Sequence, residues 1–231
     1  MKTAGIIGGI GPESTIDYYR QIIAAYREAK QDGSYPSIII NSIDLNKLRS
    51  LIEANELAET TRYLADEVQK LAAAGADFGL LAANTPHLVF DKLRRRSPLQ
   101  LLSIVEATCE TVKAMGLKRV GLFGTSFTAQ AGFYQDAFSR EGMTIILPDQ
   151  TEQAYIHDKY MNELVPGIFL PETRARLLSI VESMKEREQI EGMILGGTEL
   201  PLILRDETHD GIPFLDTTRI HVKTIVAQLL S

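Results

Sequence analysis

Three segments from the first half of the chain recur in its second half, in the same order and at nearly constant spacing. The paired segments are "GIIGGIGPESTIDYY" from Gly5 with "GLFGTSFTAQAGFY" from Gly121, "FGLLAANTPHLV" from Phe78 with "GMILGGTELPLI" from Gly192, and "LSIVEATCETV" from Leu102 with "LDTTRIHVKTI" from Leu215. The offsets are 116, 114 and 113 residues. Self-similarity of this kind predicts that the chain is built from two copies of one structural unit.

Each copy alternates short apolar runs with amphipathic helical stretches, which predicts an α/β fold with parallel sheets covered by helices on both faces. The predicted strands are 4–8, 37–41, 78–84, 100–104, 119–124, 144–148, 192–197 and 212–216. One clear helical pattern, 56–75, ends at Gly75 as a C-terminal cap. We expect a first domain of residues 1–98 plus 208–231 and a second of 99–207, related by a pseudo-twofold axis with a ligand cleft between them.

Composition limits the function classes. The net charge is −6 and the one dense basic run is 92–96, which favours a solvated helix end over a nucleic-acid site. The chain has no apolar run long enough to span a membrane and no signal-peptide pattern, which predicts a cytoplasmic protein. The single cysteine, Cys109, excludes an intrachain disulfide and a cysteine-based metal site, and its helical spacing predicts burial. No metal site is expected.

The first glycine-rich turn, "GIIGGIGPEST", is predicted to lie between a strand and a helix. Backbone N–H groups at such a turn bind anions, so Gly9 and Ile10 are candidate contacts for a ligand carboxylate, with a purely structural turn as the alternative. The spacing does not fit a dinucleotide fingerprint, because the third glycine would fall on Ser14. A phosphate-binding P-loop is excluded too, since no lysine follows the glycines.

The equivalent turn of the second copy is "GTSFT". Thr125 and Thr128 could hold a ligand carboxylate, and capping of the following helix is an equally good reading. The turn does not match the nucleophile elbow of serine hydrolases.

The turns "ANTPH" and "GGTEL" follow the third predicted strand of each copy. Asn84, Thr85 and Thr198 are candidate ligand contacts. His87 and Glu199 are candidate proton carriers, although each stands at a helix start, where a structural role is more common.

Together these motifs resemble the aspartate/glutamate racemase family, the cofactor-independent racemases that also include hydantoin and glutamate racemases. The motifs are "GIIGGIGPESTIDYYR", "NTPH", "LFGTSFT", "GGTELPLI" and "FLDTTRIHV", and they span the whole chain. The resemblance implies two Rossmann-like domains, an amino-acid substrate, no pyridoxal phosphate or other cofactor, and commonly a homodimer. It also implies two catalytic thiols, one directly before "NT" and one directly before "TE". Those positions are Ala83 and Gly197.

A methyl group and a hydrogen cannot transfer protons, so we expect the chain to lack two-base racemisation. Three explanations remain open. The first is a variant made inactive to trap a ligand. The second is a natural relative that does other chemistry, such as a lyase or isomerase reaction, with His87, Glu199, Asp44 or water. The third is a non-catalytic protein that binds an amino acid or dicarboxylate. Loss of both side chains is expected to widen the site. Lys47 or Arg49 could pair with a side-chain carboxylate of the ligand, and exposed surface charge is the alternative for both.

Overall fold

The computed structural model describes residues 2–231, which form two compact units. Unit 1 comprises residues 2–104 and 221–231, and unit 2 comprises residues 105–220. The sequence-based division lay at 98/99 and 207/208, and it differs from the observed one for a reason visible in the strand pairing. The fourth strand of the chain pairs with the third and stays in unit 1, whereas the ninth pairs with the seventh and stays in unit 2.

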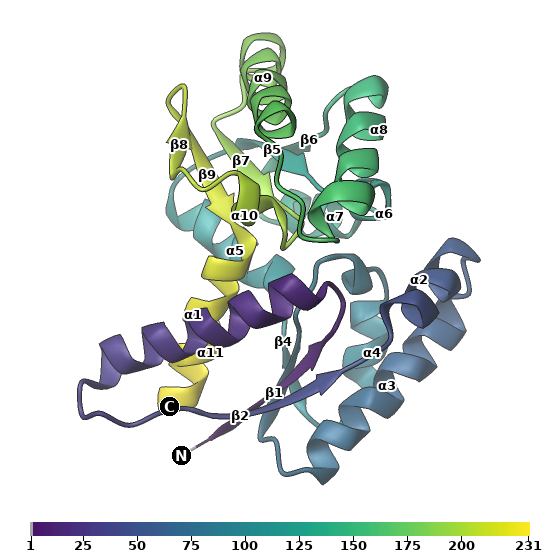
Figure 1. The fold of residues 1–231 in the computed structure, drawn as a ribbon, viewed down its shortest axis with the longest axis vertical. Helices are drawn as coiled ribbons and strands as arrows, with labels where there is room; N and C mark the ends of the chain where they lie inside the picture. Colours follow the sequence, from purple (N-terminus) through teal and green to yellow (C-terminus); the bar gives the residue numbers. More distant parts are fainter. Residues whose placement is uncertain (1) are drawn as a thin grey trace. The chain divides into compact units, whose positions relative to one another are not determined.

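Unit 1 is a four-stranded parallel sheet in the order β2-β1-β3-β4, with helices on both faces (Figure 1). Its elements are β1 (Thr3–Gly8), α1 (Pro12–Lys30), β2 (Ser37–Ser42), α2 (Leu45–Glu53), α3 (Leu57–Ala73), β3 (Phe78–Leu81), the 3-10 turn η1 (Thr85–Val89), α4 (Phe90–Arg96) and β4 (Gln100–Leu102), joined by the end of the C-terminal helix α11 (Thr217–Leu230).

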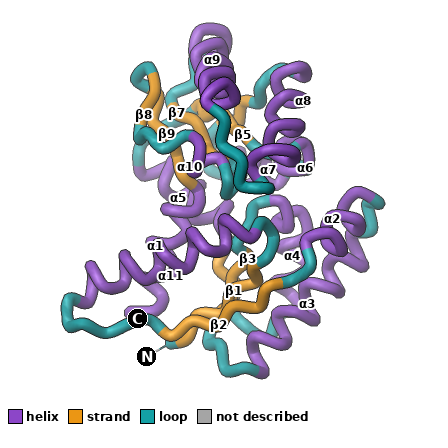
Figure 2. The backbone as a smooth tube through the Cα atoms, viewed as in Figure 1, coloured by secondary structure: helices purple, strands orange, loops and turns teal. Residues whose placement is uncertain are grey.

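Alternation along β1 decides which helices cover each face of this sheet. Ala4 and Ile6 are fully buried in a cluster with residues of α1 and α11. Gly5 points to the opposite face, where a Cβ atom would lie 3.1 Å from the Leu71 side chain of α3. The central strands β1 and β3 are buried on both faces, which explains why they are almost continuously apolar in the sequence. Figure 2 shows α1 and α11 together on one side of this sheet.

Unit 2 repeats this plan with one extra strand. Its sheet has the order β6-β5-β7-β9-β8, in which β8 alone runs antiparallel to its neighbour. The elements are α5 (Ile104–Ala114), β5 (Arg119–Phe123), α6 (Ser126–Gln130), α7 (Phe133–Arg140), β6 (Thr144–Ile146), α8 (Gln150–Lys159), the π-helical turn η2 (Tyr160–Leu164), α9 (Pro171–Glu188), β7 (Gly192–Leu195), α10 (Leu200–Ile203), β8 (Thr208–His209) and β9 (Ile212–Asp216).

The internal repeat is confirmed by the topology. β1, β2, β3 and β4 occupy the same places in their sheet as β5, β6, β7 and β9 do in theirs. Gly5 of β1 pairs with Gly79 of β3, and Gly121 of β5 pairs with Met193 of β7, so the repeat extends to the register of the central strands. The predicted α/β class with parallel sheets is confirmed.

Element ends differ from the expected ones in a few places. β3 stops at Leu81, so that residues 82–84 belong to the turn rather than to the strand. β8 has only two residues and gave no sequence signal. Gly75 follows the end of α3 with φ 95°, which confirms the expected cap. Within residues 2–231, no helix is both long and apolar enough to cross a membrane.

Candidate functional site

The turn after β1 is held closed by its own residues. Gly9 has φ 77°, and a Cβ atom there would lie 2.5 Å from the carbonyl oxygen of Ile43. Its N–H donates to the Thr15 hydroxyl at 2.9 Å. The N–H of Gly9 therefore already has a hydrogen-bond acceptor within the turn. A glycine is needed at this position because the backbone of Ile43 leaves no room for a side chain. Ile10, the next residue, is partly exposed.

The turn after β3 carries Ala83 where the family resemblance implies a thiol. Ala83 is 5% exposed and Asn84 is 3% exposed, while Thr85 at the start of η1 is only partly buried. Thr85 and Asn84 are thus placed at the carboxyl end of a central strand, which is where parallel α/β sheets bind ligands.

His87 lies below this turn in the interior of unit 1. Its ring stacks on Phe90 with centroids 4.5 Å apart, and its Nδ1 lies 3.2 Å from the carbonyl oxygen of Asn84. Burial, with a smaller contribution from His221, lowers the pKa of His87 to about 3. The imidazole is therefore neutral near pH 7, which favours a structural role over proton donation.

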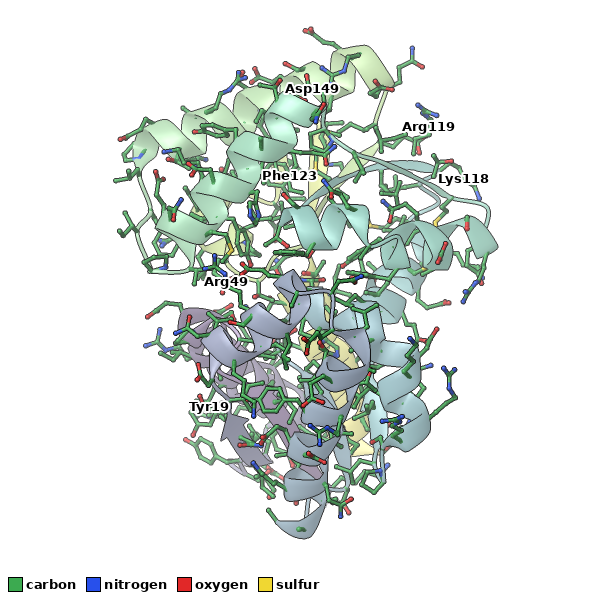
Figure 3. All side chains as sticks on the ribbon, turned by 90° about the vertical axis from the view of Figure 1, so that its right-hand side faces the viewer. Tyr19, Arg49, Lys118, Arg119, Phe123 and Asp149 are labelled. Atoms are coloured by element: carbon green, nitrogen blue, oxygen red, sulfur yellow. The ribbon has the colours of Figure 1, made fainter. Side chains whose placement is uncertain are left out.

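Lys47 and Arg49 both lie on α2 and are exposed. The Lys47 ammonium sits 4.2 Å from the centre of the Tyr63 ring. Arg49, labelled in Figure 3, pairs with Glu53 of the same helix at 2.6 Å. Both cations thus have local contacts of the kind that surface residues make.

In unit 2, the turn after β5 is capped by its threonines. Thr125 precedes α6, and its hydroxyl accepts from the Thr128 N–H at 3.2 Å, which is N-terminal capping. The Ser126 N–H donates to Nδ1 of His157 on α8 at 3.2 Å. β5 runs from the exposed Arg119 to the fully buried Phe123, both labelled in Figure 3, and ends directly before this turn.

The turn after β7 differs most from expectation. Gly197 has no side chain, yet the space for one is filled: a Cβ atom there would lie 2.8 Å from both Cζ and the hydroxyl oxygen of Tyr160 in η2. The Tyr160 hydroxyl donates to the Glu199 carboxylate, and the Thr198 hydroxyl donates to the same carboxylate oxygen at 3.1 Å. The expectation that loss of a side chain at position 197 widens the site is therefore wrong at this turn.

These three polar residues are deeply buried, with Tyr160, Thr198 and Glu199 at 7%, 2% and 1% exposure. Burial, with a further contribution from the Glu199 carboxylate, holds the pKa of Tyr160 well above its usual value. The phenol is therefore protonated over the physiological range and serves as a hydrogen-bond donor.

The lone thiol does not supply the missing chemistry. Cys109 lies in α5 at 5% exposure, and its Sγ lies 3.7 Å from the carbonyl oxygen of Ala137. Burial raises the pKa of Cys109 to about 11. Its expected burial is confirmed, and it remains a thiol rather than a reactive thiolate near pH 7. Among residues 2–231, no group of three or more His, Cys, Asp or Glu side chains could hold a metal ion.

Comparison with known proteins decides the family. The family model for Asp/Glu/hydantoin racemases matches residues 7–225. The chain belongs to this family. It is 27% identical to the broad-specificity amino-acid racemase RacX of Bacillus subtilis over 98% of both chains.

Solved members of the racemase family share the fold over the whole chain. A candidate Asp/Glu racemase of Yersinia pestis is 30% identical with a TM-score of 0.90, and an aspartate racemase homologue of Pyrococcus horikoshii is 33% identical with a TM-score of 0.84. Each comparison covers 100% of both chains. The family membership expected from the motifs is confirmed.

Sequence reasoning missed Tyr160. It precedes Gly197 by 37 residues and lies outside every repeated segment. The available signal was the second glycine of "GGTEL", because a glycine at the end of a strand indicates close approach by another group.

Proposed function

We propose that this racemase-family protein binds a small carboxylate or amino acid through groups at the carboxyl ends of its central strands, and that it does not racemise the ligand by the two-thiol route. The carrying observation is that neither family thiol position holds a thiol: the two residues are Ala83 and Gly197. The one cysteine is buried in α5 with a raised pKa.

Removal of an amino-acid α-proton needs a base within reach of the carbon and a second group to return a proton. General acid–base groups contribute about 10²–10⁴ in rate, so loss of both leaves little turnover by this route. Binding is a separate property, and the family membership with the intact fold supports its retention.

The proposed ligand contacts fall into two groups. Ile10 and Thr85 are partly exposed at their turns. The backbone N–H of Ile10 and the hydroxyl of Thr85 are therefore the first choice for hydrogen bonds to a ligand carboxylate. Gly9, Asn84, Thr125, Thr128 and Thr198 are buried and shape the turns. Lys47 and Arg49 are exposed on α2 and are the weakest of the proposed contacts.

A second candidate function is a lyase or isomerase reaction that uses other residues. The buried hydrogen bond between Tyr160 and Glu199 favours it, since buried pairs of titratable groups are candidates for proton transfer. A non-catalytic amino-acid sensor is the third candidate function.

We also propose that the protein needs no cofactor, acts in the cytoplasm and forms a homodimer. Analytical ultracentrifugation would test the homodimer.

Isothermal titration calorimetry with D- and L-amino acids and simple carboxylic acids tests the binding proposal. At least one of these ligands is expected to bind, and Thr85→Val is expected to weaken that binding about tenfold, the effect of one lost hydrogen bond to a charged group. Thr144→Val on the exposed edge of β6 is the matched control. Absence of binding by the whole panel would contradict the proposal.

A further inference from the structure

In the turn after β7, the space beside Gly197 is filled by the side chain of Tyr160. Gly196 and Gly197 directly follow β7, which ends at Leu195. The aromatic ring of Tyr160 lies so close to Gly197 that its Cζ atom is 2.8 Å from where a Cβ atom would be. Real Cβ atoms do not approach ring carbons to this distance, because it is far inside van der Waals contact. Residue 197 and residue 160 therefore share one volume, and only one of them can have a side chain there.

The hydroxyl of Tyr160 also takes part in a hydrogen-bond network with the polar side chains of the turn. It donates to the Glu199 carboxylate, which also accepts from Thr198. The donors that a ligand carboxylate would need at this turn are thus directed at a residue of the chain.

The charge of the turn acts in the same direction. Glu199 is 1% exposed and stands at the start of α10. A second carboxylate placed beside a buried carboxylate is strongly disfavoured, since like charges repel most where water is excluded.

The backbone that carries Tyr160 is itself unusual. At Lys159, the last residue of α8, the chain passes directly into the π-helical turn η2, in which the Val165 N–H donates to the Tyr160 carbonyl at 2.9 Å. Single π-helical turns within helices occur frequently at functional sites. This turn packs against α10, the helix that follows Gly197 and Glu199.

We propose that Tyr160 is a specificity-determining residue: with Gly197 and Glu199 it closes the turn after β7 to acidic groups, so that the protein takes ligands with a single carboxylate, such as neutral amino acids. This inference rests on the proposed ligand binding. It also explains why residue 197 is a glycine: the ring of Tyr160 occupies the space that a side chain at position 197 would need.

The test is calorimetric titration of D- and L-alanine and of D- and L-aspartate into the wild-type protein and three variants. Tyr160→Leu removes the ring atoms nearest Gly197 and the hydroxyl, whereas Tyr160→Phe removes the hydroxyl alone. Leu177→Ala is the control, because Leu177 belongs to the same apolar cluster and is 1% exposed but lies on α9.

The wild-type protein is expected to bind alanine at least tenfold more tightly than aspartate of the same configuration. Tyr160→Leu is expected to reduce that ratio at least tenfold, Tyr160→Phe to reduce it less, and Leu177→Ala to leave it unchanged. Wild-type preference for aspartate would overturn the inference while upholding the proposed function. An unchanged ratio in folded Tyr160→Leu would also overturn it, and failure of every ligand to bind the wild type would overturn both.

Discussion

The ring of Tyr160 occupies the space that any side chain at Gly197 would need. The absence of a side chain at position 197 is therefore linked to Tyr160, which lies 37 residues earlier in the sequence. A cysteine substituted for Gly197 would meet the phenol ring, so this turn cannot hold a thiol at position 197 unless Tyr160 is changed as well.

Gly197→Ala is expected to destabilise the protein by about 1–3 kcal/mol, the usual effect of forcing an extra methyl group into a packed interior. The measurement is the free energy of unfolding from urea titration. In a Tyr160→Leu background the same substitution is expected to have much less effect, because leucine lacks the ring atoms that the methyl group would meet. In a Tyr160→Phe background most of the effect is expected to remain. Equal effects in all three backgrounds would show that the two positions are independent.

Gly9→Ala and Gly33→Ala form a matched pair, since both glycines have positive φ, 77° and 79°. At Gly33 a Cβ atom has nothing within 4 Å, so only the backbone conformation opposes alanine, at about 1–2 kcal/mol. At Gly9 the carbonyl of Ile43 is 2.5 Å away, and a larger loss is expected. Urea unfolding of both variants measures the difference. Equal losses would mean that the turn after β1 relaxes freely around a side chain.

Protein stability is expected to fall as the pH drops below about 6.5. Burial lowers the pKa values of His87 and His221 to about 3, so the unfolded chain binds protons that the folded chain does not. The stabilisation is therefore complete above the unfolded pKa and is lost progressively as pH falls toward the folded value. Between neutral pH and pH 5 each histidine is expected to contribute a loss of about 2 kcal/mol. Urea unfolding at a series of pH values measures this slope.

The window above pH 5 separates this effect from the carboxylates, whose protonation destabilises the fold at lower pH. His221→Leu is expected to reduce the slope, because His221 contributes one of the two shifts and contacts Tyr18 through Nδ1 at 2.9 Å. Val222→Ala is the control: Val222 is its neighbour on α11, is 2% exposed, and carries no titratable group. A slope that is the same in His221→Leu and the wild type would contradict the assignment.

Cys109 is expected to react slowly with a disulfide reagent in the native protein. Its pKa, raised from 9.0 to about 11, lowers the thiolate fraction at pH 8 roughly 100-fold. Absorbance at a fixed reagent concentration, with and without urea, measures the ratio of rates. Comparable rates in the two conditions would show that the thiol is accessible and reactive.

The sequence predicted the fold well because the features that specify it are local. Apolar runs, helix periods and Gly75 each signal their own element, and the repeat linking Gly5 to Gly121 predicted two copies of one unit, in agreement with the matching sheet orders. The division into domains was less exact, because strand pairing rather than chain order assigns β4 and β9 to their units.

The candidate site was only partly predictable. Motifs alone pointed to Ala83 and Gly197, because the family resemblance implies a thiol at each of these positions. The partner of Gly197 could not, because contact between η2 and the turn after β7 depends on packing across unit 2. Sequence spacing likewise could not reveal that Thr15 takes the N–H of Gly9.

The most direct test of the central claim is α-proton exchange, followed by NMR in D₂O with D- and L-alanine and D- and L-aspartate. The account predicts no protein-dependent loss of the α-proton signal and no change in enantiomer ratio, because neither position 83 nor position 197 carries a thiol. Rapid protein-dependent exchange of either enantiomer, with conversion to the other, would contradict it.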